Sequence, residues 1–218
     1  MLNKKQKNVA IIDYGVGNLY SLFKAFEYLN ADIFITEDAD KIMSADAIIL
    51  PGVGAFKSGM DGLRVRGLIE VVKKFAKTGK PILGICLGAQ LMLSKGYEFG
   101  EFNGLGIIPG KVIRFPKLKE KVPHIGWNEI KKVKRGKLKA ESWKKTILDS
   151  AKENTDVYFV HSYILQPDKK GHVLSLANYG GYEFCSAIRK NNIYGCQFHP
   201  EKSGEAGLKI IENFIKLI

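Results

Sequence analysis

Short apolar runs alternate with amphipathic stretches in the first half of the chain. Unbroken apolar runs are typical of buried parallel strands, and apolar residues at i, i+3 and i+4 are typical of the helices that cover them. Asn18 can cap one such helix, whose apolar positions are 19, 22, 23, 26 and 29. We predict a longer helix at 63–78, ended by the segment GKP, and strands at 9–13, 32–36, 47–50 and 82–83.

The pattern changes after residue 93, where glycines separate shorter segments and strands become dominant. The dipeptides at 180–181 (Gly-Gly) and 191–192 (Asn-Asn) are turn signals, so we expect hairpins there. An amphipathic helix begins at Gly204, with Ser203 as its expected cap and positions 208, 211, 215 and 218 facing inward. Strands are expected at 106–108, 111–115, 157–163, 173–179, 184–189 and 193–198.

Together these elements predict an α/β fold. Its mostly parallel central sheet is flanked by helices, and an additional antiparallel strand region follows in the C-terminal half. We find no internal repeat, low-complexity segment or flexible linker. We therefore expect a single domain over residues 1–218.

Composition narrows the class of protein. Apolar residues make up 45% of the 218 residues, which is an ordinary globular proportion. No apolar run approaches the roughly 20 residues that cross a bilayer, so we expect no membrane association. Three cysteines at wide spacing form neither a disulfide framework nor a metal-binding pair. We expect a cytoplasmic protein without a metal site.

The net charge of +12 suggests nucleic-acid binding as one function. Much of the excess lies at 117–145, where lysines predominate and only two tryptophans are available for stacking. We favour a solvated lysine-rich surface and expect no nucleic-acid partner. A face that meets an acidic protein or a phosphorylated metabolite stays open.

Candidate chemistry begins with the segment GICLG, which places Cys86 between Gly84 and Gly88. A nucleophile framed by glycines between a strand and a helix is typical of the sharp turn called a nucleophile elbow. The turn exposes the side chain, and the N–H groups at the start of the helix point toward it. A thiol placed there is expected to be more nucleophilic than a free cysteine.

A base for this thiol is available in the segment CQFHPE. His199 and Glu201 stand two residues apart after an apolar strand, so in extended backbone both side chains face one side. The carboxylate would orient the imidazole, whose other nitrogen would face Cys86. The residues therefore indicate a Cys-His-Glu triad of an acyl-transfer enzyme or a hydrolase. The other histidines, at 124, 161 and 172, are adequately explained as structural.

The segments GICLGAQ and QFHPEKSG resemble those of the class I (triad-type) glutamine amidotransferases. The segments IDYGVGNLYS, LPGVGAF, VPHIGWN and YFVHSY resemble the glutaminase subunits of imidazole glycerol phosphate synthases within that family. The resemblance extends from residue 9 to the C-terminal helix. It implies an enzyme that needs no cofactor and releases ammonia from L-glutamine.

The resemblance also implies a role for each matching residue. Cys86 would attack the side-chain amide, His199 would carry the proton and Glu201 would orient His199. Backbone N–H groups of Val53 and Leu87 would form the oxyanion hole. The remaining expected substrate-binding residues are Gly52, Gln90, Glu98, His161, Ser162 and Tyr163.

The resemblance implies a partner as well, because the glutaminase motifs occupy the whole chain. In the family, the partner is a (β/α)₈-barrel cyclase of histidine biosynthesis that forms a heterodimer with the glutaminase. Asn18 and Trp127 match positions that meet the cyclase. An alternative is a paralogous subunit that supplies ammonia to a sugar-amidinating synthetase of surface-polysaccharide biosynthesis. The segment GYEFGE and the long basic stretch 131–154 depart from the histidine enzymes and keep that alternative open.

Overall fold

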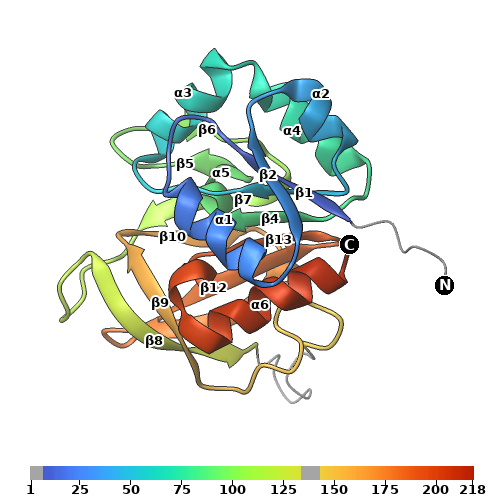
Figure 1. The fold of residues 1–218 in the computed structure, drawn as a ribbon. Helices are drawn as coiled ribbons and strands as arrows, with labels where there is room; N and C mark the ends of the chain where they lie inside the picture. The colour runs from blue at the N-terminus through green and yellow to red at the C-terminus, as the bar shows by residue number, and fades with distance from the viewer. Residues whose placement is uncertain (1–6, 134–142) are drawn as a thin grey trace.

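The computed structural model describes residues 7–133 and 143–218. Four pairings between five neighbouring strands, all parallel, form the centre of the sheet. These strands are buried along nearly their whole length except at the outer strand, as expected when helices cover both faces. Their order is β2 (Asp32–Thr36), β1 (Asn8–Ile12), β3 (Ala47–Leu50), β4 (Ile82–Ile85) and β13 (Ile193–Cys196) (Figure 1).

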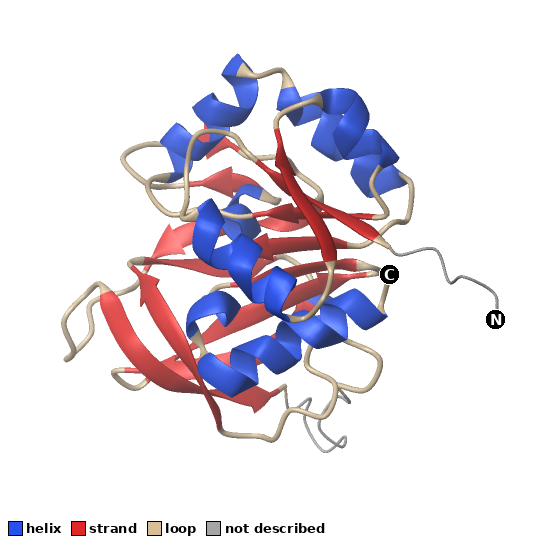
Figure 2. Cartoon of the chain, viewed as in Figure 1, coloured by secondary structure: helices blue, strands red, loops and turns tan. Residues whose placement is uncertain are grey.

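Helices lie on both faces of this block (Figures 1 and 2). On one face, α1 (Leu19–Tyr28) and α6 (Gly204–Lys216) pack against each other, with the rings of Phe26 and Phe214 edge to face at 6.4 Å. A second apolar core lies under the helices of the opposite face. These are α2 (Ala39–Ser44), α3 (Phe56–Val65) and α4 (Leu68–Lys77).

An antiparallel region continues the sheet beyond β13. The turns at Gly180-Gly181 and Asn191-Asn192 connect antiparallel neighbours, which confirms both predicted hairpins. The α/β prediction with an antiparallel C-terminal region is therefore confirmed. All described strand pairs of this region are antiparallel except β5 with β7, which is parallel. The strands are β5 (Leu93–Gly96), β6 (Phe102–Asn103), β7 (Ile108–Arg114), β8 (His124–Lys132), β9 (Thr155–His161), β10 (Tyr163–Pro167), β11 (Val173–Tyr179) and β12 (Tyr182–Lys190).

The helix expected at 63–78 is wrong in its bounds, because the structure has two helices in this region. Gly67 stands between α3 and α4 in the left-handed conformation, with φ of 68°. A glycine adopts this conformation at little cost, so the chain can change direction there. The apolar residues on the two sides of the break follow one helical period, so the break cannot be recognised from the sequence pattern.

The strand expected at 157–163 is also two strands. Ser162 separates β9, which pairs with β8, from β10, which pairs with β7. Conversely, the strands expected at 106–108 and 111–115 are the single strand β7. Strand β8 and the short helix α2 were not predicted, and α2 is capped by Asp38, whose carboxylate accepts from the N–H groups of Asp40 and Lys41.

The two expected helix caps have different outcomes. The side chain of Asn18 accepts from the N–H of Ser21, so Asn18 caps α1 as predicted. Ser203 precedes α6, but its hydroxyl does not cap the helix. It donates to the carbonyl of His199 at 2.6 Å and accepts from the N–H of Tyr158 at 2.9 Å. Ser203 therefore ties the turn after β13 to β9.

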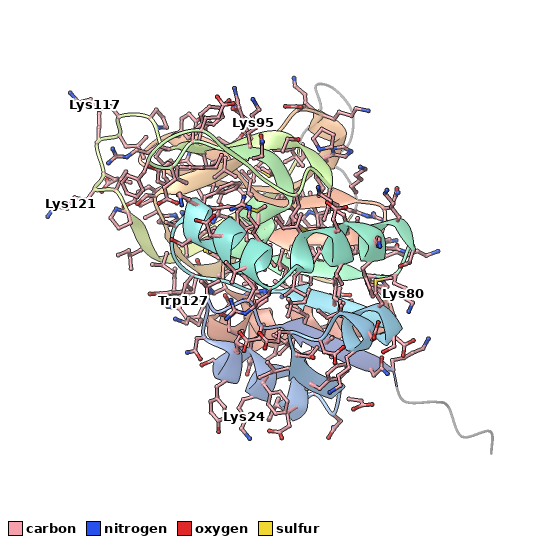
Figure 3. All side chains as sticks on the ribbon, turned by 90° about the horizontal axis from the view of Figure 1, so that it is seen from above. Lys24, Lys80, Lys95, Lys117, Lys121 and Trp127 are labelled. Carbon is pink, nitrogen blue, oxygen red and sulfur yellow. The ribbon has the colours of Figure 1, made fainter. Side chains whose placement is uncertain are left out.

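Lysines are spread over the surface, and part of the 117–145 stretch lies outside the described residues. Lys117 and Lys121 share one protruding loop, whereas Lys24, Lys80 and Lys95 lie at other edges of the molecule (Figure 3). Lys24 pairs with Glu27, and Lys95 pairs with Glu101. No helix among the described residues is both long and apolar enough for a membrane span.

Gly88 is required by a close backbone contact. A Cβ at this position would lie 1.7 Å from the carbonyl oxygen of Leu50. We predict that Gly88→Ala lowers the free energy of unfolding by about 3 kcal/mol or more, because neither backbone segment can move without displacing a buried strand. Urea unfolding measures this loss.

Gly67→Ala is the matched control. A Cβ at Gly67 would meet nothing within 4 Å, although its positive φ costs about 1–2 kcal/mol for an alanine. If Gly88→Ala were no less stable than Gly67→Ala, the steric explanation would be wrong.

Candidate active site

Cys86 occupies the turn between β4 and α5 (Leu87–Leu91), as predicted for a nucleophile elbow. Its φ of 50° and ψ of −106° are unusual for a residue other than glycine, and such strain clusters at functional sites. The backbone holds the turn in place, since the N–H of Cys86 donates to the carbonyl of Cys196 at 2.7 Å. The segment around Cys86 is thereby fixed to the end of β13.

His199 and Glu201 follow β13 at the same edge of the sheet. Nδ1 of His199 lies 2.8 Å from Oε1 of Glu201, and both side chains are almost fully buried. His199 precedes the short 3-10 helix η2 (Pro200–Lys202) and Glu201 lies within it, so neither residue belongs to a strand. The two side chains meet as expected. The turn of the backbone brings them together, and not the alternation of side chains along an extended strand.

The imidazole of His199 is held between two acidic partners. Burial alone lowers the pKa of His199, but hydrogen bonds and negative charge from Cys86 and Glu201 outweigh burial and raise its pKa to about 10. Nε2 of His199 is buried and has no hydrogen-bond partner of normal geometry among the described residues. Since Nδ1 faces the carboxylate, Nε2 is the nitrogen available to a thiol proton.

A cavity of about 410 Å³ opens beside the thiol. Its lining brings together most of the residues that the sequence assigned to substrate binding. They are Val53, Cys86, Gln90, Glu98, His161, Ser162 and Tyr163, joined by Gly54, Pro123, Val160 and Lys202. His199 and Glu201 line an adjoining smaller hollow together with Asn18, Gly52 and Val53.

The two expected oxyanion donors do not converge in this structure. The N–H of Leu87 donates to the carbonyl of Gly52 at 3.3 Å and is therefore occupied. A trans peptide holds its carbonyl and N–H on opposite sides, so the N–H of Val53 points away from Leu87. Rotation of the Gly52–Val53 peptide would bring both donors to one side. Gly52, with φ of 156°, places the least steric restriction on such a rotation.

Gln90 and Glu98 reach the cavity from different elements. Gln90, on α5, donates from Nε2 to the carbonyl of Tyr163 at 3.1 Å. Glu98 accepts from the N–H of Phe56, the first residue of α3, at 2.7 Å. This bond fixes one carboxylate oxygen of Glu98 at the cavity wall.

His161 belongs to a pair of buried histidines. Its Nδ1 lies 2.9 Å from the carbonyl of Tyr163, and its Nε2 lies 3.1 Å from Nδ1 of His124. A carbonyl only accepts, so Nδ1 of His161 carries the hydrogen and His124 donates to His161. Burial lowers the pKa of His124 to about 4 and that of His161 to about 3. The structural explanation of both histidines therefore holds, although His161 also lines the cavity.

The two expected partner-facing residues are accessible. Trp127 is 57% exposed on β8, and Ile125, two residues before it, is 60% exposed. The core tryptophan of the described chain is Trp143, whose Nε1 donates to the carbonyl of Leu174. Asn18 is exposed where α1 begins and lines the hollow that also contains His199.

Sequence reasoning missed Gln197. This fully buried side chain places Nε2 3.8 Å from Sγ of Cys86 and Oε1 3.2 Å from Nε2 of Gln90. Its position directly after the apolar strand β13 could have indicated it, because a buried polar side chain needs a hydrogen-bond partner.

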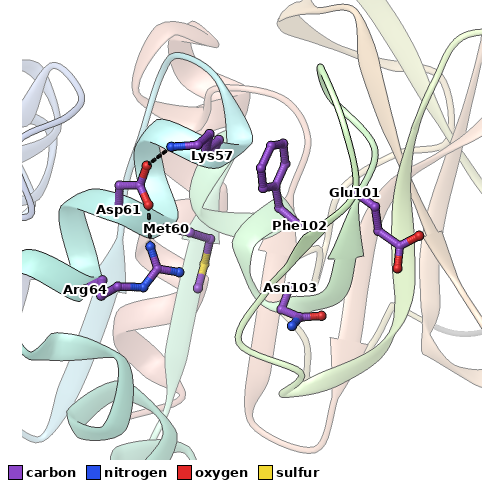
Figure 4. A pocket seen from close by; sticks show the side chains of 7 residues that line it. All are labelled: Lys57, Met60, Asp61, Arg64, Glu101, Phe102 and Asn103. Atoms are coloured by element: carbon purple, nitrogen blue, oxygen red, sulfur yellow. Dashed lines mark hydrogen bonds and ion pairs between the residues drawn. The ribbon is translucent and has the colours of Figure 1, made fainter.

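A second cavity, of about 370 Å³, lies between α3 and the β5–β6 hairpin (Figure 4). Asp61 there forms ion pairs with Lys57 and Arg64, all partly exposed. None of the residues that line it lines the Cys86 cavity. It contributes nothing to the candidate active site.

Known proteins resemble this chain over nearly its whole length. The Imidazole glycerol phosphate synthase subunit HisH 1 of Legionella pneumophila (strain Lens) is 48% identical over 215 residues, which cover 96% of this chain and 99% of the relative. The subunit HisH of Chlorobaculum tepidum is 42% identical over 206 residues, covering 94% and 98%.

Solved structures agree in fold. The structure of PurLQS from Thermotoga maritima has a TM-score of 0.71 at 18% identity and covers 97% of this chain and 98% of that one. A glutamine amidotransferase from Thermotoga maritima has a TM-score of 0.63 at 18% identity, covering 96% and 82%.

The family model described as Glutamine amidotransferase class-I matches residues 10–217. Its span includes the elbow, the His199–Glu201 pair and the cavity between them. The chain belongs to the class I glutamine amidotransferase family.

Proposed function

We propose that the chain is the glutaminase subunit of an imidazole glycerol phosphate synthase. It hydrolyses L-glutamine to glutamate and ammonia, and it passes the ammonia to a (β/α)₈-barrel cyclase of histidine biosynthesis. The observation that carries the proposal is the buried His199–Glu201 pair, linked to a strained Cys86 at the edge of a cavity of amino-acid size. Relatives at 42–48% identity over nearly the whole chain support the pathway.

In the proposed reaction, the proton of the Cys86 thiol is held on Nε2 of His199, and Sγ attacks the side-chain carbonyl carbon of glutamine as a thiolate. An S–C bond forms and the C–N bond breaks. His199 gives its proton to the departing nitrogen, which leaves as ammonia. Water then attacks the thioester carbon and gives a proton to His199, so that a C–O bond forms, the S–C bond breaks, and glutamate and the pair of Cys86 thiolate and His199 imidazolium are restored. Glu201 keeps Nε2 directed at the thiol throughout.

The remaining residues would bind substrate and partner. Gln90 and Glu98 would hold the α-amino acid end of glutamine, with His161, Ser162 and Tyr163 on the opposite wall. The exposed face of Trp127 and Asn18 would meet the cyclase, with which the chain would form a heterodimer. The three cysteines are free, which fits a reducing compartment, and we place the reaction in the cytoplasm.

Cys86→Ala tests the reaction in an assay coupled to the cyclase. We predict loss of glutamine-dependent synthesis of imidazole glycerol phosphate, while synthesis from added ammonium salts continues, because the cyclase needs only the ammonia. Cys185→Ala is the matched control: Cys185 is buried in β12, and its variant should retain glutamine-dependent synthesis. Glutamine hydrolysis by Cys86→Ala at the wild-type rate would refute the mechanism.

Occupation of the Leu87 N–H by the Gly52 carbonyl predicts a partner-dependent enzyme. We predict that glutamine hydrolysis by the chain alone is slow and rises about 10²–10³-fold with cyclase and acceptor bound, the range set by one oxyanion donor. The measurement is glutamate release with and without the partner. Equal rates would show that the resting geometry already suffices. A rate increase only with a sugar synthetase would assign the chain to the other pathway.

Glu201→Gln tests the raised pKa of His199. A protonated imidazole stabilised by the fold contributes stability that is fully present below its ordinary pKa of 6.5 and is lost as pH rises through about 10. We therefore predict that Glu201→Gln is less stable than wild type by about 1–3 kcal/mol at pH 6, with a difference that shrinks toward pH 10. Urea unfolding at several pH values measures it.

The control for this substitution is Glu205→Gln, an exposed glutamate in the first turn of α6. It should leave the stability profile unchanged. Turnover of glutamine by Glu201→Gln should fall by at least about 10²-fold, because His199 loses its orienting partner. A stability difference that stays constant from pH 6 to pH 10 would contradict the assigned charge state.

A further inference from the structure

We propose that Gln197 is a further catalytic residue, whose side-chain amide donates a hydrogen bond to Sγ of Cys86 and stabilises the thiolate. The inference rests on the proposed function, because it assigns a donor to the nucleophile of that reaction. It adds a side chain, besides His199, that contacts the sulfur.

The orientation of the Gln197 amide follows from its neighbours. The carbonyl of Tyr163 can only accept, so the Gln90 atom that lies 3.1 Å from it is the donor Nε2. The same Nε2 lies 3.2 Å from Gln197, which must therefore present its oxygen to Gln90. The other arm of the Gln197 amide is then the NH₂ group, and it lies 3.8 Å from Sγ.

The position of Gln197 is fixed by the backbone around it. Its N–H donates to the carbonyl of Ser186 on β12 at 2.9 Å, and the preceding Cys196 accepts from the N–H of Cys86. The residue is completely buried, so no exposed surface lets bulk water compete for the amide. A donor held in a low-dielectric site interacts more strongly with a charged acceptor than it would in water.

A second neighbour of the sulfur, the carbonyl of Val160, explains why such a donor is needed. Sγ lies 3.9 Å from the carbonyl oxygen of Val160, which can accept a hydrogen bond from the thiol but faces a thiolate unfavourably. The ionisable groups that interact electrostatically with Cys86 are His199, which Glu201 contacts, and Tyr14. Glu98, His161 and Lys202 line the same cavity as Cys86. Burial first, and then the negative charge of Cys86, raises the pKa of Tyr14. Tyr14 donates to the carbonyl of Pro51, so its hydroxyl is already engaged.

Sγ carries negative charge at two points in the proposed reaction. It does so before it attacks glutamine and again when the S–C bond of the thioester breaks and the electron pair returns to sulfur. The Gln197 N–H is directed at Sγ in the resting structure, so it can act at both points. The hydrogen bond that Oε1 of Gln197 accepts from Gln90 also fixes the side-chain amide of Gln90, which would bind substrate, relative to Cys86.

Alkylation by iodoacetamide in the absence of glutamine tests the donor directly. Cys86→Ala sets the background from the two other cysteines. We expect Gln197→Met, which has no donor, to reach its half-maximal alkylation rate at a pH about one unit higher than wild type, and to react about tenfold more slowly at pH 7. Gln197→Glu places an acceptor beside the sulfur and should shift the profile further.

Matched controls separate this effect from damage to the fold. Gln166→Glu makes the same chemical change at an exposed position of β10 and should follow the wild-type profile. Thermal unfolding reports whether each variant is folded at the temperature of the assay. In the complex with the cyclase, both Gln197 variants should lower kcat for glutamine more than they change KM.

A profile for Gln197→Met that superimposes on wild type, with or without a lower Tm, would overturn the proposal and leave Gln197 a structural residue. If Gln197→Met did not fold, the same comparison with Gln197→Leu, which also removes the donor without adding an acceptor, would decide. Failure of the proposed function gives a different result: Cys86→Ala would still release glutamate, whatever the alkylation profile of the Gln197 variants.

Discussion

The parallel pairing of β4 with β13 is the constraint on which the active site depends. It places Ile85 opposite Cys196, and the 2.7 Å bond from the Cys86 N–H to the Cys196 carbonyl continues the pairing into the turn. More than a hundred residues separate the two strands along the chain, but their carboxyl ends share one edge of the sheet. The nucleophile and the segment that carries Gln197, His199 and Glu201 are therefore held by main-chain bonds, and their geometry does not depend on flexible side chains.

The same edge determines how the sulfur is surrounded. β4 supplies the thiol, the segment after β13 supplies an imidazole and an amide, and β9 supplies the carbonyl of Val160. Each contact therefore depends on a different part of the fold. Glycines keep this arrangement close-packed, because a Cβ at Gly84 would come within 2.8 Å of the backbone of Ala89.

The parts of the fold predicted correctly are those with an unambiguous local pattern. Apolar runs gave the parallel strands, and turn dipeptides gave both hairpins. The break at Gly67 was missed because the apolar periodicity of the sequence continues across it. The break at Ser162 was missed because β9 and β10 are distinguished only by pairing with different strands. Cys86, His199 and Glu201 could be named from their motif. The contacts of Gln197 with Cys86 and Gln90 could not be predicted from the sequence, because they depend on how closely the end of β13 lies to α5 in the folded protein. The roles assigned to the site residues, those of the triad included, stay predictions.

The neutral pair His124–His161 has a consequence for the charge of the cavity wall. Because burial lowers the pKa of His161 to about 3, it adds no positive charge beside the thiol at neutral pH. The formally charged groups of known sign in the lining are then Glu98 and Lys202, one negative and one positive. A free amino acid at neutral pH carries the complementary pair, one ammonium and one carboxylate. The lining therefore holds one side chain of each sign, whereas a glutamine side chain within a peptide carries neither an ammonium nor a carboxylate group.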